Sequence, residues 1–154
     1  MGRLDDYVAL KELTDRGSLK TYRGIPENNG GFTPDDGLMT CREHIQHLSL
    51  VERYILRKII DALNLQLDFP EVDSTDSITT EIDTLIQTWQ LTGNLLAKMQ
   101  DDDLDKTIKL EEENIQVDVR HLLHVLVEHQ VHHRGEMVVY IRAMGLVPPK
   151  RWAD

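Results

Sequence analysis

The segment from residue 118 to residue 149 constrains the fold most, because it has the pattern of one long amphipathic helix. Asp118 can cap its start and Gly145 can end it, and the prolines at 148 and 149 prevent continuation. At about 100° per residue, one face of roughly 80° collects apolar residues and two histidines. These residues are Leu122, Leu126, His129, His133, Met137, Tyr140 and Met144.

Three further segments have helical patterns. The first spans Leu4 to Tyr22 and offers apolar residues for packing, namely Leu4, Tyr7, Val8, Leu10 and Leu13. A second helix begins after Thr40, which forms a capping-box sequence with Glu43, and is expected to reach about Leu65. The third begins near Asp76 and Ser77 and repeats apolar residues on one face, namely Ile78, Ile82, Leu85, Trp89 and Leu96.

The connections complete the expected architecture. Residues 24–37 are rich in Gly, Pro and Asn, and this long loop is expected to carry a crossover between the first two helices. The acidic run Asp101–Asp103 is interpreted as a solvated turn after the third helix. With no strand pattern and no repeat period, the chain is predicted to be all-α, a four-helix bundle forming one domain over residues 1–154.

Charge and cysteine content exclude several classes of function. The formal net charge is −10 and Lys and Arg are not clustered, which argues against binding to nucleic acid. Cys41 is the only cysteine, so no internal disulfide can form. No apolar run approaches the ~20 residues of a membrane span. We therefore expect a cytoplasmic protein that binds neither nucleic acid nor membrane.

His129 and His133 are the first candidate ligands. Four residues separate them, so their rings project from successive turns of the apolar face. Two buried imidazoles without partners are costly, whereas a cation uses both lone pairs. The alternative is that each ring hydrogen-bonds a core carboxylate or carbonyl, and the sequence leaves the two readings evenly balanced.

A third ligand would come from another helix, and the second helix offers His44 and His47. The helical period leaves both open and weakly favours His44, which lies nearer the apolar centre of that helix. Cys41 is expected to pack rather than to bind metal. The other three histidines (His121, His124 and His132) are off the apolar face and are expected at the surface.

Other metal classes do not fit. Zincin proteases need Glu directly after the first histidine of the pair, where this chain has Gln130. Di-iron bundles need Glu-x-x-His pairs, and the sequence contains none.

Two motifs are similar to those of the DinB-like superfamily of metal-binding bundles. One is the stretch from His129 to Met137, which continues through Gly145 to the two prolines; the family typically has His-x-x-x-His-Arg-Gly-Gln there. The other is the stretch from Thr40 to Leu48, where the family has a metal-binding histidine seven residues after a Ser or Thr cap. The resemblance therefore implies His47, together with His129 and His133, as metal ligands and His44 as a packing residue.

Glu136 departs from the family pattern, which usually has Gln at this position. It is a weak catalytic candidate: it could accept a hydrogen bond from the N–H group of a ligand histidine or act as an acid or base. A surface ion pair is the interpretation we favour from the sequence.

The resemblance also implies a function. Members are often dimers with a three-histidine site for zinc, nickel or a similar divalent ion, and resemble metal-dependent hydrolases or transferases that use low-molecular-weight thiols. We expect a metalloenzyme acting on a small molecule, possibly a thiol, and a homodimer. The alternative is a non-catalytic metal-binding or sensing protein, or a helical interaction module.

Overall fold

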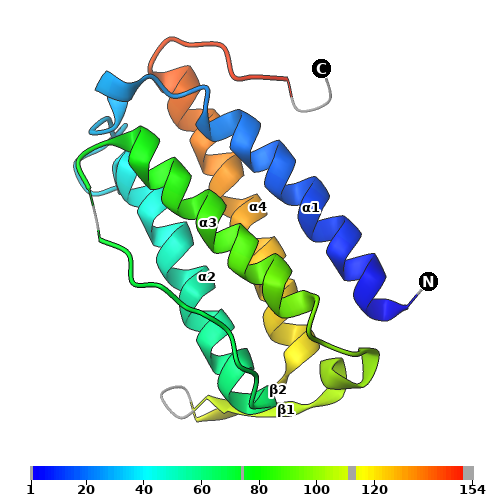
Figure 1. Cartoon of the computed structure of the whole chain (residues 1–154). Coiled ribbons are helices and arrows are strands. Elements are labelled where there is room, and N and C mark those ends of the chain that lie inside the picture. The colour runs from blue at the N-terminus through cyan, green and yellow to red at the C-terminus, as the bar shows by residue number, and fades with distance from the viewer. Residues whose placement is uncertain (1, 74, 111–113, 151–154) are drawn as a thin grey trace.

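The structure is a computed structural model that describes residues 2–73, 75–110 and 114–150. Its long elements are α1 (Arg3–Tyr22), α2 (Cys41–Leu63), α3 (Ile78–Leu96) and α4 (Val119–Ala143), as Figure 1 shows. Two 3₁₀ turns, η1 (Glu27–Asn29) and η2 (Asp101–Asp105), and two short strands, β1 (Thr107–Leu110) and β2 (Ile115–Asp118), lie between them. The predicted all-α four-helix bundle is confirmed.

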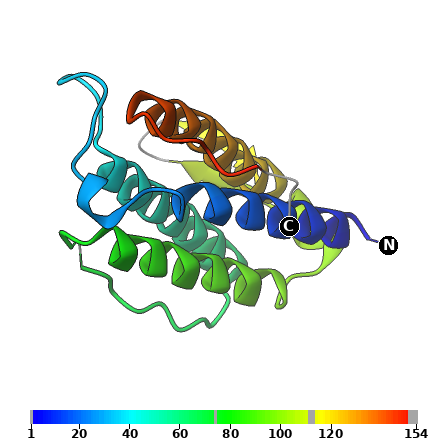
Figure 2. The same cartoon turned by 90° about the horizontal axis from the view of Figure 1, so that it is seen from above.

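The helices occupy the four corners of the bundle. α1 packs against α3 and α4, and α2 packs against the same two helices, so α1 and α2 lie diagonally opposite (Figure 2). Residues 23–40 therefore cross the end of the bundle, as the long loop predicts. α2 and α3 run in the same direction, and residues 64–73 return along the length of the bundle between them (Figure 1).

The helix starts follow the predicted capping residues. The Thr40 hydroxyl accepts a hydrogen bond from the Glu43 N–H at 3.2 Å, and the Glu43 carboxylate accepts one from the Thr40 N–H at 2.7 Å. The Ser77 hydroxyl caps α3, and the Asp118 carboxylate caps α4. Gly145 follows the end of α4 with a φ of +78°, a conformation that favours glycine.

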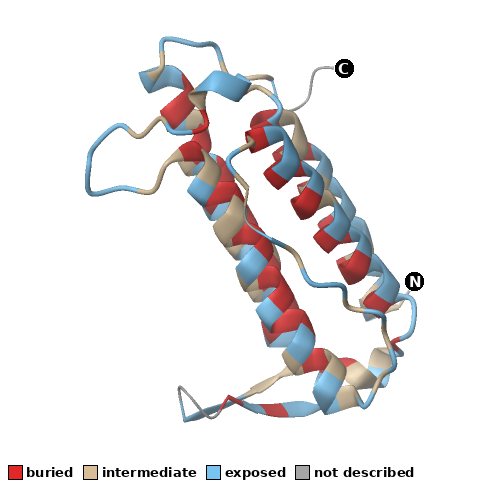
Figure 3. Cartoon of the chain, turned by 60° about the vertical axis from the view of Figure 1, so that its left-hand side comes forward, coloured by how far each residue is buried: buried red, intermediate tan, exposed pale blue. Residues whose placement is uncertain are grey.

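The core is formed by the inward faces of the helices, where buried residues gather (Figure 3). The five apolar residues predicted to share one face of α3 are all buried. Within the residues that the structure describes, no helix is long and apolar enough to cross a membrane.

The prediction for the packing face of α1 is wrong in part. Leu10 and Leu13 are 44% and 38% exposed, whereas the polar residues Lys11, Thr14 and Ser18 are buried. The reason is a buried ionic network, in which Lys11 Nζ lies 2.6 Å from Asp15 Oδ1 and 3.1 Å from Glu52 Oε1 on α2. The side chain of Gln130 on α4 accepts a further hydrogen bond from Lys11 at 3.3 Å.

The expectation that the chain has no strands is also wrong. β1 and β2 pair in antiparallel register, with Thr107 opposite Asp118 and Leu110 opposite Ile115. Ile108 and Leu110 are buried under the end of the bundle. Four-residue strands are too short to produce a distinctive alternating pattern in the sequence.

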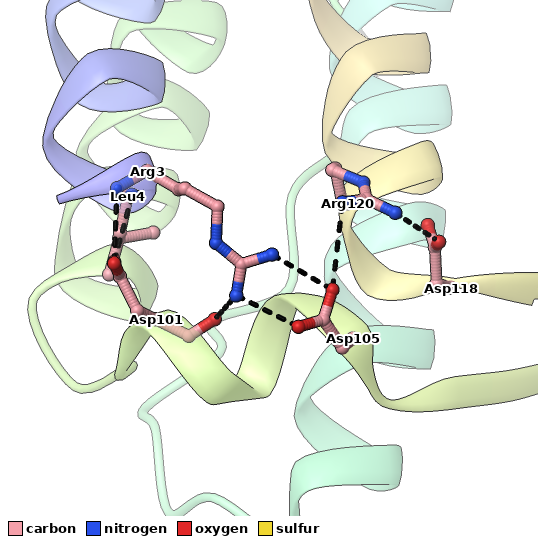
Figure 4. Close-up of polar contacts among 6 residues, drawn as sticks. All are labelled: Arg3, Leu4, Asp101, Asp105, Asp118 and Arg120. Carbon is pink, nitrogen blue, oxygen red and sulfur yellow. Dashed lines mark hydrogen bonds and ion pairs between the residues drawn. The ribbon is translucent and has the colours of Figure 1, made fainter.

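The acidic run is more than a solvated turn, because it forms η2 and holds the start of α1 (Figure 4). Asp101 accepts hydrogen bonds from the backbone N–H groups of Arg3 and Leu4 at 3.1 and 3.0 Å. Asp105 pairs with Arg3 and also contacts Arg120 of α4. These contacts connect η2 with the starts of α1 and α4 at one end of the bundle.

Candidate metal centre

Three histidines from two helices meet in the seam between α2 and α4. The Nε2 atom of His129 lies 3.1 Å from Nε2 of His47 and 3.0 Å from Nε2 of His133. His47 and His129 are half-buried and His133 is buried. The structure thus brings together His47, His129 and His133, the three residues that the resemblance implies as ligands.

This arrangement fits a divalent cation. Each neutral imidazole carries one N–H group, so the Nε2 atom of His129 cannot both donate to and accept from its two Nε2 neighbours, those of His47 and His133. Two nitrogen ligands on an ion with bonds of ~2.1 Å lie about 3.0 Å apart at right angles and about 3.4 Å apart in a tetrahedron, near the observed separations. The side chains available therefore fit one metal ion held by three nitrogens.

The protonation of these rings favours metal binding. Burial, followed by the proximity of His133 and His47, lowers the pKa of His129 to about 4. Burial also lowers the pKa of His133. Because metal ligation requires a neutral imidazole, the cluster is prepared for a cation at neutral pH.

A second group of side chains lies behind His133. The Nδ1 atom of His133 is 2.7 Å from Glu136 Oε2 and 3.1 Å from Nδ1 of His44. Glu136 Oε2 and His44 Nδ1 are 3.7 Å apart. With Nδ1–H donating to the carboxylate, the Nε2 lone pair of His133 is directed toward His47 and His129. His132 Nε2 lies 3.3 Å from the other Glu136 oxygen, so the surface ion pair that we favoured for Glu136 describes only part of its contacts.

His44 is buried, as the helical period of α2 predicts, but it lies behind the three-histidine cluster. Its ring packs edge-on against Tyr140, with ring centroids 5.0 Å apart. The Tyr140 hydroxyl donates to the carbonyl oxygen of Met39 at 2.9 Å. This role of Tyr140 was not predicted from the sequence, although its place on the apolar face of α4 could have indicated it.

The remaining candidates are not part of the three-histidine cluster. Cys41 is fully buried, and burial raises the pKa of its thiol to about 11, so it packs as a neutral residue. His121, His124 and His132 are exposed, as predicted.

Comparisons with known proteins agree with this fold. A sequence profile described as the DinB superfamily matches residues 12–137. The uncharacterized protein YjoA of Bacillus subtilis (strain 168) is 26% identical over 123 residues, which cover 79% of this chain and 77% of YjoA.

Two crystal structures have a similar fold. A DinB-like protein from Bacillus cereus ATCC 10987 superposes with a TM-score of 0.78 at 19% identity, over 95% of both chains. The YjoA structure from Bacillus subtilis superposes with a TM-score of 0.67 at 19% identity, over 96% of this chain and 94% of that one. Because the superfamily profile matches more than half of its length, this chain belongs to the DinB superfamily.

Proposed function

We propose that the protein is a metal-dependent enzyme that activates a small nucleophile, either water for hydrolysis or a low-molecular-weight thiol for transfer to an electrophile. The observation that carries the proposal is the convergence of three histidine nitrogens. The Nε2 atom of His129 lies 3.1 Å from that of His47 and 3.0 Å from that of His133. Zinc and nickel are the metals we favour, since both bind imidazole well.

Three protein ligands leave part of the coordination sphere of an ion available, as in catalytic rather than structural sites. A bound divalent ion would lower the pKa of a coordinated water or thiol and so supply the nucleophile near neutral pH. The half-buried rings of His47 and His129 leave this side of the cluster within reach of a small substrate.

The protein groups around the cluster would orient the ligands rather than exchange protons with a substrate. The Glu136 carboxylate is engaged by the Nδ1 atom of His133, so we assign it a positioning role rather than that of a general base. His44 supports the same ring from the buried side, with its own pKa lowered by burial and by His133.

The packing supports an enzyme over a protein that uses the ion only to hold its fold. Two apolar clusters, one on each side of the histidine level, already connect the helices. A preformed bundle of this kind should remain folded without metal, unlike a domain whose folding depends on a structural ion.

The test compares chelator-treated protein with the same protein reloaded with zinc or nickel. The probes are hydrolysis of an activated ester and transfer of a low-molecular-weight thiol to 1-chloro-2,4-dinitrobenzene. We expect one of these activities in the reloaded protein and none after chelation, with an unchanged helical circular dichroism signal. His129→Ala should abolish the activity and His121→Ala, an exposed histidine of the same helix, should retain it. Unfolding on chelation, or an activity that survives in His129→Ala, would contradict the proposal.

A further inference from the structure

A groove runs along the bundle between α1 and α3, on the side opposite the seam that holds the histidines (Figure 2). Its volume is about 630 Å³, which is within the range of small-molecule sites. On α1 its lining extends from Leu4 to Leu19, a distance of about 22 Å at 1.5 Å per residue. The groove therefore has the volume and the length to hold an extended small molecule.

The walls of this groove are mainly apolar. The apolar residues that line it include Val8, Leu19, Ile86, Trp89 and Leu96. Lys11 and Asp15 also line it, but their charges pair with each other at 2.6 Å. The middle of the groove therefore suits an apolar chain rather than a charged group.

Gly93 widens the groove on its α3 side. It lies inside the helix, where glycine is less favourable than alanine. A Cβ added at this position would meet no atom within 4 Å, so crowding by a neighbouring element does not account for the glycine. The missing side chain instead leaves open space between the two helices, at a residue that lines the groove.

The groove ends at three basic residues of α1, namely Arg16, Lys20 and Arg23. They are spaced by four and three residues, so the helix brings them to one face although they are not adjacent in the sequence. Arg16 and Leu19 line both the groove and a second cavity of about 330 Å³, which Lys20, Arg23 and Pro149 also line. None of the three cations forms an ion pair with another residue that the structure describes.

The acidic residues of the groove are fewer and are partly engaged. Asp5, at its other end, accepts a hydrogen bond from the Gly2 N–H at 2.9 Å and so belongs to the cap of α1. Asp15 is paired with Lys11, which leaves Glu12 as the remaining acid of the lining. In a chain with a net charge of −10, three unpaired cations in one place mark the end of the groove as a site for an anion.

We propose that this groove binds an amphipathic anion, a free aliphatic carboxylate, with its chain between α1 and α3 and its carboxylate on Arg16 and Lys20. Guanidinium groups bind carboxylates through paired hydrogen bonds, and side chains four residues apart on a helix are neighbours. An amphipathic cation in the same orientation would place its head group beside like charges, which is unfavourable. The site is separate from the metal centre, so it does not rest on the proposed catalysis.

The first test is a titration with decanoate, kept below the concentration at which it forms micelles. Trp89 reports on the groove once Trp152 is replaced by Phe, because the chain contains two tryptophans. We expect a saturable change in Trp89 fluorescence, with one decanoate bound per chain. Decylammonium, a cation of the same chain length, should bind at least about tenfold more weakly. No saturable binding of decanoate, or equal binding of the two compounds, would overturn the proposal.

Charge reversal tests the site of the head group. Arg16→Glu combined with Lys20→Glu should weaken the binding of decanoate at least about tenfold and strengthen that of decylammonium, because two carboxylates then face the head group. The matched control is Arg142→Glu, which changes an exposed arginine of α4 and should leave both affinities unchanged. A preference for decanoate that survives the double variant would contradict the assignment.

Filling the groove tests the site of the chain. Gly93→Leu adds a side chain to the lining of the groove and should abolish the binding of decanoate. Asn94→Leu adds the same side chain at the exposed neighbouring position, which does not line the groove, and should retain the binding. Circular dichroism establishes that both variants are folded. Binding of wild-type strength in folded Gly93→Leu would overturn the proposal.

Two other occupants of the groove would give different results. If the groove received a membrane surface, the protein would sediment with phosphatidylglycerol vesicles and would not bind decanoate in their absence. If a second copy covered the groove, sedimentation equilibrium would show a dimer that does not bind decanoate. Either outcome would overturn the proposal. Chelator-treated and zinc-loaded protein should bind decanoate with the same affinity, so a failure of the metal centre would leave this result unchanged.

Discussion

The Nδ1 atom of His133 lies 2.7 Å from Oε2 of Glu136, one helical turn further along α4. This contact determines which nitrogen of the ring remains available to a metal. A hydrogen bond from Nδ1–H to a carboxylate leaves Nε2 as the free lone pair and increases its basicity. Through His133, Glu136 therefore influences the electronic properties of the candidate metal centre.

The first prediction concerns this pair. Glu136→Ala should weaken zinc binding by roughly 10- to 100-fold, because His133 loses the acceptor that fixes its ring. Glu136→Gln retains an uncharged acceptor and should lie between the wild type and Glu136→Ala. Competition with a chromophoric chelator measures the affinity, and Glu128→Ala, an exposed glutamate of the same helix, is the control. Equal affinities in all four proteins would show that Glu136 does not position His133.

The second prediction concerns the pH dependence of the metal-free protein. The pKa of His129 is about 4 in the folded state and near 6.5 in an unfolded chain. Between these values the unfolded state binds more protons, so the free energy of unfolding should decrease as the pH falls from about 6.5 to about 4. Urea titrations at several pH values should show a smaller decrease in the free energy of unfolding for His129→Ala than for the wild type. The same dependence of this free energy on pH in both proteins would contradict the prediction.

The third prediction concerns the buried ion network. Lys11→Met leaves the carboxylates of Asp15 and Glu52 without their ammonium group and should reduce the free energy of unfolding by about 3–5 kcal/mol. Adding Glu52→Gln should recover part of this loss, because it removes one of the unpaired charges. Denaturant unfolding measures both effects, with Lys98→Met at an exposed position as the control. A loss in Lys11→Met no larger than in the control would show that the network is not a stabilising element.

The buried network also explains where prediction from the sequence failed. Hydrophobic periodicity finds the apolar face of a helix, and in α1 that face includes the exposed Leu10 and Leu13. The buried face carries Lys11, and two of its partners, Glu52 and Gln130, come from α2 and α4 and are therefore invisible in the local sequence.

Hydrophobic periodicity was also insufficient to choose among the histidines. His129 and His133 are recognisable from their spacing alone, whereas periodicity favours His44 over His47 because it finds the most buried position. A site that must admit a substrate uses a position at the edge of the core, and His47 is half-buried. The helix starts, by contrast, depend on contacts within three or four residues, and for that reason the caps Thr40 and Asp118 and the start of α3 near Ser77 were predicted correctly.

The fourth prediction concerns Asp101, which accepts hydrogen bonds from the backbone of Arg3 and Leu4 (Figure 4). These backbone N–H groups, together with the Arg3 charge, lower the pKa of Asp101. Asp101→Ala should lower the melting temperature and accelerate hydrogen exchange at the Leu4 amide, because the start of α1 loses its acceptor. Asp102→Ala, at the exposed neighbouring position, should change neither quantity. Equal exchange rates at Leu4 in the two variants would argue against a capping role.

The most direct test of the metal centre is the metal content per chain, measured by elemental analysis on protein purified without chelator or histidine tag. We predict about one zinc or nickel ion per wild-type chain, because the three histidines form a single binding site. The ion should be lost in His47→Ala, His129→Ala and His133→Ala and retained in His44→Ala. No stoichiometric metal after addition of zinc or nickel, or retention in His47→Ala with loss in His44→Ala, would contradict the assignment of the three-histidine site.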